Sequence, residues 1–366
     1  MADLILQIPY EKLGWAAVQT LWISTLYLSG LFLAWKIMSP LTPGLNYKLG
    51  LGALLSLPFI PAFLFMEHRG VLPPVGLADW TAAETKTTGT PLIEGLPKIT
   101  GFDPGAVIPS FYFWIGILWT SAAFLLIVYH LYSLISLHLY CRNKPKLEDP
   151  KVLSQLHELT EGLGIRHNLI VKKGGEAESP ALARTAGVYL LVPACLSSRY
   201  EKEEIKGLLL HELIHLKRKD YLFSALQRLT LSLFFFQPLV WLLNPKIDRE
   251  REVVCDHAVT QLTEDSHTYG STLVKLKLQM QSALSHSLNI TDHNLVHRLR
   301  ELTKHNGQER TIRKNTRRAV LAFTVMLLTL IGTIWNSYHL HPTHNGNLQT
   351  EKPTPSAVQE RPLNNR

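Results

Sequence analysis

The chain has 366 residues, of which 46% are hydrophobic and only 18% are charged. Soluble globular domains carry about a quarter charged residues, so the composition argues against a purely soluble protein. The formal net charge of +8 raises the question of nucleic-acid binding, but the chain has no zinc-finger or aromatic RNA-binding pattern, and we expect no direct contact with nucleic acid.

Four long uncharged runs predict transmembrane helices, because each approaches the roughly 20 apolar residues that cross a bilayer. The runs are Leu13–Trp35, Leu49–Met66, Ala106–Tyr140 and Ala319–Tyr338. The second is the shortest, and Pro58 and Pro61 favour a kinked span or a hairpin with the first run. The first run is too long for a cleaved signal peptide and is followed by no small-x-small cleavage site.

The excess of lysine and arginine predicts the orientation. Residues 141–318 contain 28 basic and 20 acidic residues, whereas the remainder of the chain has nine of each. The positive-inside rule places 141–318 in the cytoplasm, on the same side as the short loop with Lys36 and Lys48. Both termini and the loop Glu67–Val107 then face outward. We expect a multi-pass protein of the inner or cytoplasmic membrane, in contact with the lipid bilayer.

These signals divide the chain into four regions. They are an N-terminal membrane region with three transmembrane helices and an outer loop (1–140), a cytoplasmic domain (141–318), a fourth transmembrane helix (319–338) and a disordered outer tail (339–366). The three cysteines all lie in the cytoplasmic domain, where free thiols are expected.

Within the cytoplasmic domain, apolar periodicity predicts a helix over Lys151–Leu163 and short strands over Leu169–Val171 and Val188–Val192. Ser198, with Glu201 three residues later, resembles a capping box and predicts the start of the next helix.

A further apolar stretch, Leu229–Pro245, is uncharged over 17 residues and is interrupted by Gln237-Pro238. It fits either a fifth span or a core or membrane-grazing helix. We favour the second interpretation, because a span would place the two motifs described next on opposite sides of the membrane.

The first motif is HELIHLKRKD, His211–Asp220. Residues four apart lie on one face of an α-helix, so His211 and His215 can point their ring nitrogens at a single ion. Glu212 can reach a water on that ion without being a first-choice ligand. Zinc accepts two imidazoles and a carboxylate and leaves a fourth position for water, whose proton a nearby glutamate can take during peptide hydrolysis.

The second motif, REREVVCDHAV, supplies the carboxylates from another helix. Glu252 and Asp256 lie four apart and share a face. We expect Glu252 to bind the metal and Asp256 to orient a ligating imidazole through its second N–H, with Glu250 as the competing ligand. Asp220 is expected to brace the end of the first motif's helix, and a solvated aspartate is the alternative.

Together with SPALARTAGVYLLVP, Ser179–Pro193, these motifs resemble the BlaR/MecR-type antirepressor membrane zinc metallopeptidases. The resemblance implies an α-helical membrane protein with four transmembrane helices and an α+β zincin-like (HExxH) metalloprotease domain of the gluzincin type. It implies that His211, His215 and Glu252 bind Zn²⁺ and that Glu212 is catalytic.

The resemblance also implies how a substrate binds. An extended peptide would add to an exposed edge strand through backbone hydrogen bonds. The residues expected to form that strand are Val188, Tyr189, Leu190, Leu191 and Val192. An internal strand is the alternative for this segment.

The expected function is that of a zinc metalloendopeptidase in signal transduction, with a cytoplasmic transcriptional repressor as the favoured substrate and the protease itself as a second. Antibiotic-sensing members carry a penicillin-binding domain after the fourth span, whereas the residues after Tyr338 contain no S-x-x-K motif, so we expect no covalent β-lactam sensing. The alternatives are a non-catalytic membrane transducer and a quality-control or CAAX-type protease. An oligomer is compatible with each.

Overall fold

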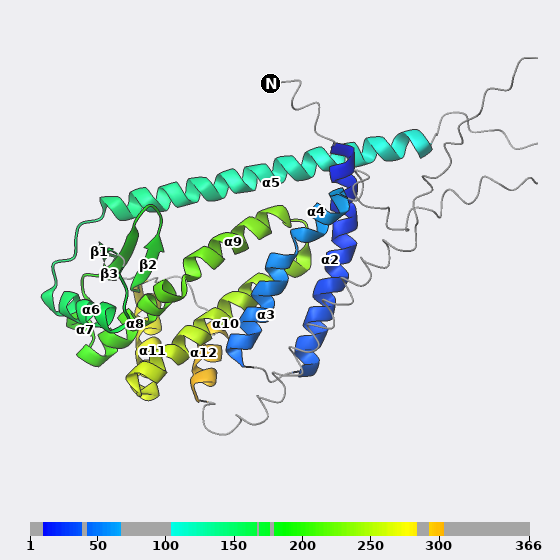
Figure 1. Ribbon diagram of the computed structural model, residues 1–366. Coiled ribbons are helices and arrows are strands. Elements are labelled where there is room, and N and C mark those ends of the chain that lie inside the picture. Colours follow the sequence, from blue (N-terminus) through cyan, green and yellow to red (C-terminus); the bar gives the residue numbers. More distant parts are fainter. Residues whose placement is uncertain are drawn as a thin grey trace, which may run out of the picture.

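A computed structural model of the chain describes residues 10–38, 42–66, 104–166, 168–175, 179–283 and 293–303. In the described residues, long apolar helices lie beside a second unit, in which helices pack around a small sheet (Figure 1). The predicted span Ala319–Tyr338 and the tail 339–366 lie outside the described residues, as does most of the loop Glu67–Val107.

Three described stretches are long and apolar enough to cross a membrane: Tyr10–Lys36, Pro43–Phe65 and Phe111–Asn143. They belong to α2 (Tyr10–Met38), to α3 and α4 (Pro43–Ser56 and Phe59–Met66) and to α5 (Pro104–Asn143). The first three predicted spans are therefore helical and apolar as expected. The second is interrupted at Leu57–Pro58, in agreement with the predicted kink, because proline cannot continue the helical hydrogen-bond ladder.

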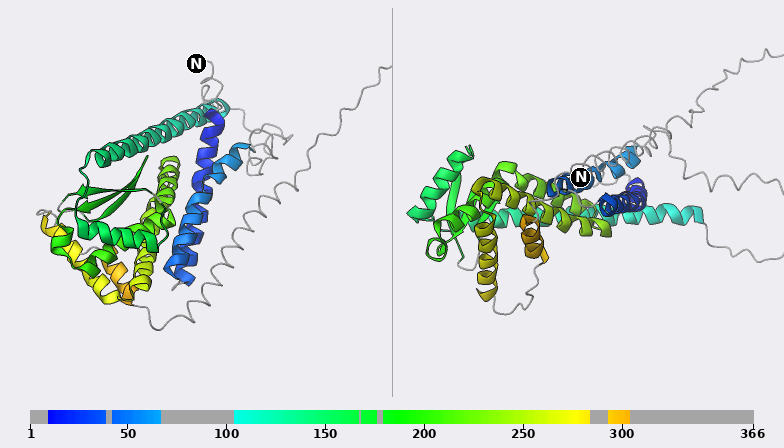
Figure 2. Two further views of the ribbon diagram at one scale, coloured as in Figure 1. Left: turned by 60° about the vertical axis from the view of Figure 1, so that its left-hand side comes forward. Right: turned by 90° about the horizontal axis from the view of Figure 1, so that it is seen from below.

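Helices α2 and α5 approach closely where a glycine lies on each. A Cβ atom on Gly14 would overlap the carbonyl oxygen of Tyr112, and one on Gly116 would overlap that of Tyr10. Small residues at such crossings allow membrane helices to bring their backbones together and gain van der Waals contact. Gly14 and Gly116 therefore fix the position of α2 against α5, and Figure 2 shows the two helices meeting in both views.

The second unit follows α5 along the chain. Its elements are α6 (Pro150–Gly162), β1 (Leu169–Gly174), β2 (Ala181–Arg184), β3 (Val188–Pro193), α7 (Leu196–Arg199), α8 (Lys202–Arg218), α9 (Asp220–Leu233), α10 (Pro238–Thr263), α11 (Ser266–Ala283) and α12 (His293–Thr303). The predicted helix Lys151–Leu163 and the two predicted strands are confirmed as α6, β1 and β3, whereas β2 was not predicted. Apolar side chains of β3 pack with α8 in one core, among them Leu190, Val192 and Leu209.

The prediction that Val188–Val192 is an exposed edge strand is wrong. The strand order is β1-β3-β2, and β3 is the central strand, parallel to β1 and antiparallel to β2. Every residue of β3 is buried. A continuous apolar run suits a strand that is covered on both faces, and here both of its edges are also hydrogen-bonded. The edges of the sheet are β1 and β2.

The predicted start of the metal-motif helix is also corrected. Ser198 lies inside the short helix α7, and α8 begins at Lys202 with Glu201 as its N-cap. The backbone N–H of Glu201 donates to the Glu204 carboxylate at 2.8 Å, so the capping box is formed one turn later, by Glu201 and Glu204.

The apolar stretch Leu229–Pro245 forms a helical hairpin. α9 ends at Leu233, the chain turns through Phe234–Gln237, and α10 begins at Pro238. The stretch is thus not one continuous helix, and polar side chains of its two arms, such as Gln227 and Arg251, contact one another. The end of the hairpin packs against α2 and α3 in a single core, with the side chains Leu28, Leu54, Phe234, Val240 and Leu243 among its members.

Candidate metal centre

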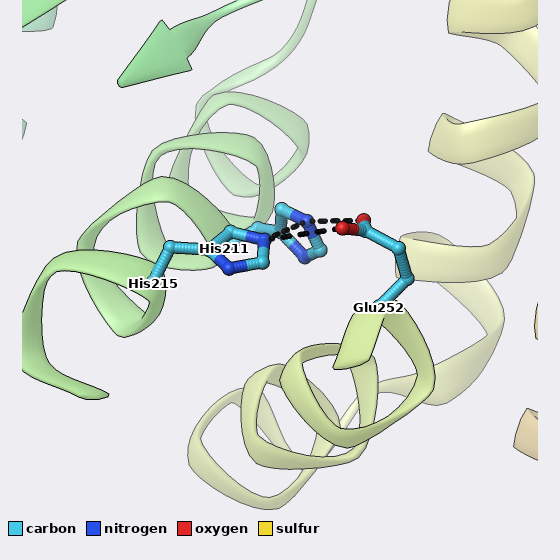
Figure 3. Close-up of side chains that lie close together, drawn as sticks. All are labelled: His211, His215 and Glu252. Carbon is cyan, nitrogen blue, oxygen red and sulfur yellow. Dashed lines mark hydrogen bonds and ion pairs between the residues drawn. The ribbon is translucent and has the colours of Figure 1, made fainter. Parts of the chain in front are cut away.

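Three side chains from two helices converge on one point (Figure 3). His211 and His215 project from the same face of α8, and their Nε2 atoms are 3.1 Å apart. Glu252 reaches them from α10, with its carboxylate oxygens 3.3 Å from Nε2 of His211 and 3.6 Å from Nε2 of His215. The structure thus brings together the three side chains that the sequence predicted as ligands.

This arrangement fits a zinc ion. Two nitrogens at zinc–ligand distances in a tetrahedron are about 3.3 Å apart, close to the observed spacing of the two imidazoles. Burial alone would lower the pKa of His211. The hydrogen bonds to Asp256 and Glu252 and the negative charges of these carboxylates outweigh burial and raise the pKa to about 10. The surroundings therefore favour positive charge between these side chains, and a divalent cation can replace a proton there.

The far nitrogen of each imidazole faces a carboxylate. Nδ1 of His215 lies 2.8 Å from Oδ2 of Asp220, and Nδ1 of His211 lies 3.2 Å from Oδ1 of Asp256. Lys219, between α8 and α9, adopts the left-handed conformation (φ 61°) that turns Asp220 back toward His215. Such contacts fix the tautomer and the direction of a metal-binding imidazole. Asp220 is 4% exposed, so it is not the solvated aspartate that the sequence left open.

Two residues that the sequence did not point to hold Asp256. Arg298 on α12 donates from Nε and Nη2 to its two oxygens, both at 2.6 Å, and the Tyr269 hydroxyl donates to Oδ1 at 2.8 Å. The same hydroxyl lies 3.0 Å from Nδ1 of His211. Burial opposes the ionised carboxylate, but the His211 and Arg298 contacts keep the pKa of Asp256 well below its usual range. Asp256 is therefore a fully buried but compensated anion.

Glu250, the competing ligand, points elsewhere. Its carboxylate is buried, lies 4.0 Å from Nε2 of His297 and interacts with Asn46 on α3. Burial raises the pKa of Glu250 to about 7. Burial would also raise the pKa of Glu252. There the hydrogen bond from His211 and the positive charge of His211 outweigh burial and lower the pKa to about 2. Of these two glutamates, Glu252 is the one that presents an ionised carboxylate to the two imidazoles.

Glu212 lies beside the two histidines on α8 and faces the sheet. Its Oε2 atom accepts a hydrogen bond at 2.9 Å from the backbone N–H of Leu182 on β2. Burial raises the pKa of Glu212, and the neighbouring imidazoles oppose that change. A carboxylate whose pKa is raised toward neutrality suits proton transfer.

Cys255 belongs to the hydrogen bonding around His215. Its Sγ atom lies 3.4 Å from Nδ1 of His215 and 3.6 Å from Oδ2 of Asp220. Burial raises the pKa of the thiol, so it stays protonated and can donate to Asp220. His215, Asp220 and Cys255 also lie close enough to hold an ion, but Nδ1 of His215 is already paired with Asp220.

A cavity of about 410 Å³ opens beside the metal centre. Glu252 and Arg298 line the side nearest the histidines. Apolar side chains from α11 and α12 line another part: Leu273, Leu276, Met280 and Leu295. The cavity can therefore accept an apolar side chain next to a group held at the metal centre.

Comparisons with known proteins place this site in context. Residues 106–302, which contain every side chain of the metal centre, match the family model described as BlaR1 peptidase M56. The Regulatory protein BlaR1 of Bacillus licheniformis is 26% identical over 266 residues, which cover 69% of this chain and 44% of that protein. BlaR1 of Staphylococcus aureus is 24% identical over 259 residues, or 67% of this chain and 43% of the relative. The Methicillin resistance mecR1 protein of the same species is 24% identical over 115 residues, 31% of this chain and 20% of the relative. The chain thus spans less than half the length of these relatives.

Replacing Glu252 or Glu250 by glutamine tests which of the two carboxylates binds the metal. We expect Glu252→Gln to weaken zinc binding by more than about 100-fold, beyond the 10–100-fold typical of residues that only orient ligands. The matched control is Glu250→Gln on the same helix, which should retain stoichiometric zinc. Zinc content after dialysis and competition with a chelator measure both. Equal zinc loss in the two variants would contradict the assignment.

We expect Arg298 to affect zinc binding indirectly, because it holds the Asp256 carboxylate that faces His211. Arg298→Gln leaves a buried carboxylate without its charge partner, so we expect zinc affinity to fall by roughly 10–100-fold while the fold persists. Arg300→Gln, at an exposed position of the same helix, is the control and should bind zinc as the parent does. Chelator competition with circular dichroism on the same samples tests this. Unchanged affinity in Arg298→Gln would show that Asp256 needs no such partner.

Proposed function

Because the chain belongs to the BlaR1 peptidase M56 family, we propose that it is a zinc endopeptidase embedded in the membrane. One observation carries the proposal: His211, His215 and Glu252 converge from two helices, and Glu212 lies directly beside them. Two imidazoles, one carboxylate and an adjacent free carboxylate are the chemical groups that metal-dependent peptide hydrolysis requires.

The metal site and Glu212 have different roles in the proposed reaction. A zinc ion held by His211, His215 and Glu252 would act as a Lewis acid toward a water and toward the substrate carbonyl. Glu212 takes a proton from the attacking water and returns it to the leaving amine. The hydrogen bond from Leu182 holds one oxygen of Glu212 in place and leaves the other free for this transfer. Asp220 and Asp256 keep both imidazoles aimed at the ion.

We propose that an extended segment of the substrate lies along β2. This strand is hydrogen-bonded to β3 on one side, and its Leu182 N–H points to Glu212 on the other. Extended peptides bind strand edges through backbone hydrogen bonds. An apolar substrate residue would then enter the cavity beside Glu252, where Leu276 and Met280 line the wall.

The printed name of one relative supports a role in regulation. The Bacillus relative is named a regulatory protein, so we propose that this chain acts in regulation, by cleaving a cytoplasmic transcriptional repressor and itself. The chain covers less than half of that relative.

We also propose that the metal centre lies on the cytoplasmic side. α2 ends near Lys36 and α5 ends at Arg142 and Asn143, from which the chain continues into the metal-bearing unit. Basic residues at these helix ends support a cytoplasmic location for that unit.

Glu212→Gln tests catalysis. The variant keeps the three ligands, so we expect it to bind zinc as the parent does and to lose proteolysis by at least about 100-fold, the low end of a general-base contribution. Glu203→Gln, an exposed glutamate on the same helix, is the control. Mass spectrometry of new N-termini in cells that express each variant identifies the cut sites.

The outcomes of that comparison are distinct. Cuts that disappear only in Glu212→Gln support an active endopeptidase. Signalling that persists in Glu212→Gln would show a transducer that acts by contact. Cuts spread over many unrelated membrane proteins would show quality control in place of a dedicated substrate.

A fusion reporter tests the orientation. Alkaline phosphatase fused after Lys146 should be inactive, because the enzyme needs an oxidising compartment, and a fluorescent protein at the same position should be bright. The same pair fused within Glu67–Val107 should give the opposite pattern. Phosphatase activity after Lys146 would reverse the proposed topology.

A further inference from the structure

Polar side chains lie between α9 and α10, while several apolar side chains of the hairpin are exposed. Leu229, Trp241 and Leu242 are 44%, 54% and 62% exposed. Gln227, in contrast, is 3% exposed and lies between the two helices. Water-exposed hairpins have the reverse arrangement, with apolar residues between the helices.

The polar contacts between the two helices are extensive. Nε2 of Gln227 donates to Asn244 at 2.9 Å and to Asp248 at 3.1 Å. Arg251 donates to Ser224 and to Oε1 of Gln227, both at 2.9 Å. These groups satisfy one another inside the hairpin and leave its outer surface to leucine and tryptophan.

The turn of the hairpin has its backbone groups capped by side chains. The indole of Trp119 on α5 donates to the carbonyl of Leu233, and that of Trp241 donates to the carbonyl of Phe235, both at 2.8 Å. The backbone N–H of Gln237 donates to the carbonyl of Phe234 at 2.9 Å. Non-helical backbone is tolerated within a bilayer only where its polar groups are satisfied in this way.

The turn lies next to the middle of a candidate span. The fully buried amide of Gln237 donates to the Ser24 hydroxyl at 2.6 Å, to the Thr25 hydroxyl at 3.0 Å and to the carbonyl of Leu21 at 3.2 Å. These three residues are central in the apolar stretch Tyr10–Lys36 of α2. Figure 1 shows the turn between α9 and α10 below α5, at the end of the hairpin that is nearer to α2.

Two basic residues bound the apolar part of the hairpin. Arg228 precedes Leu229 on α9, and Lys246 follows Pro245 on α10. The ammonium of Lys246 lies 3.6 Å from the ring centre of Trp35, near the end of α2. The segment between Pro238 and Pro245 rises about 12 Å as a helix, somewhat less than half of the roughly 30 Å hydrocarbon core.

We propose that Leu229–Pro245 is a re-entrant hairpin, which enters the bilayer from the side of the metal centre, turns near the middle and binds lipid acyl chains with Leu229, Trp241 and Leu242. The partner is lipid because this face continues the surface of the apolar helices, with which the hairpin shares one core. The inference concerns membrane contact alone and stands whether or not the chain cleaves a substrate.

Cysteine labelling tests the proposal in the full chain within open membrane fragments. The background variant is Cys195→Ser, which removes the one cysteine among the three that is partly exposed. Cys141 and Cys255 are buried and stay in place, and their labelling in this background variant is measured and subtracted. The test positions are Leu229→Cys and Leu242→Cys, and Trp241 stays in place because its indole caps the turn. The controls are Leu262→Cys and Leu278→Cys, 55% and 60% exposed in the parent and distant from the turn.

We expect a membrane-impermeant maleimide to label the two test positions at least tenfold more slowly than the controls, and all four equally after denaturation. Spin labels at the test positions should collide often with oxygen and rarely with a nickel chelate, as labels in hydrocarbon do. Labelling as fast as in the controls would overturn the proposal by placing the hairpin in water. Slow labelling with protection from both oxygen and nickel would also overturn it, because protein would then cover the face in place of lipid.

Discussion

The metal centre depends on the contact between α8 and α10, where two imidazoles of one helix meet two carboxylates of the other. Glu252 faces Nε2 of both histidines, and Asp256 faces Nδ1 of His211. The spacing of four residues within each motif gives each helix two aligned groups. His211 is therefore held between two carboxylates, and its position fixes the distance between the helices at the point where an ion would bind.

This contact buries the charge of Asp256, and a buried charge needs a partner. Asp256 is completely buried, and removing one partner of a buried charge typically costs 3–5 kcal/mol. Arg298 supplies two short hydrogen bonds and Tyr269 a third. Those residues come from α12 and α11, so the two helices that follow the second motif serve to hold Asp256. With Asp220 at the start of α9, the centre is thus built by five helices, although its predicted ligands come from two.

The sequence was most informative where one helix determines the geometry. The pairs His211–His215 and Glu252–Asp256 each share a helical face, and the structure brings all four together as the spacing predicted. Arg298 and Tyr269 were missed because each acts through a contact with a distant helix, which no local pattern encodes. The edge-strand prediction failed for Val188–Val192 although the signal was present, since an apolar run without alternation favours a strand covered on both faces. Ser198 failed as a cap because Glu201 and Glu204 offer a better-paired capping box one turn later.

One helix connects the core shared with α2 and α3 to the candidate metal centre. α10 begins at the Gln237 turn beside α2 and continues without interruption through Pro245 to Glu252 and Asp256. Glu252 follows Pro245 by two turns, about 10 Å along the axis. If the hairpin lies in the bilayer with α10 along the membrane normal, this distance sets the height of the centre about 10 Å outside the hydrocarbon, at the outer edge of the headgroup region. At that height, an extended segment of a substrate would reach the centre more readily than a folded domain would. Binding along the edge of β2 has the same requirement, because only a stretch of chain without its own secondary structure can add to a strand edge. The position of the centre near the bilayer and the open strand edge would then both favour an extended substrate segment.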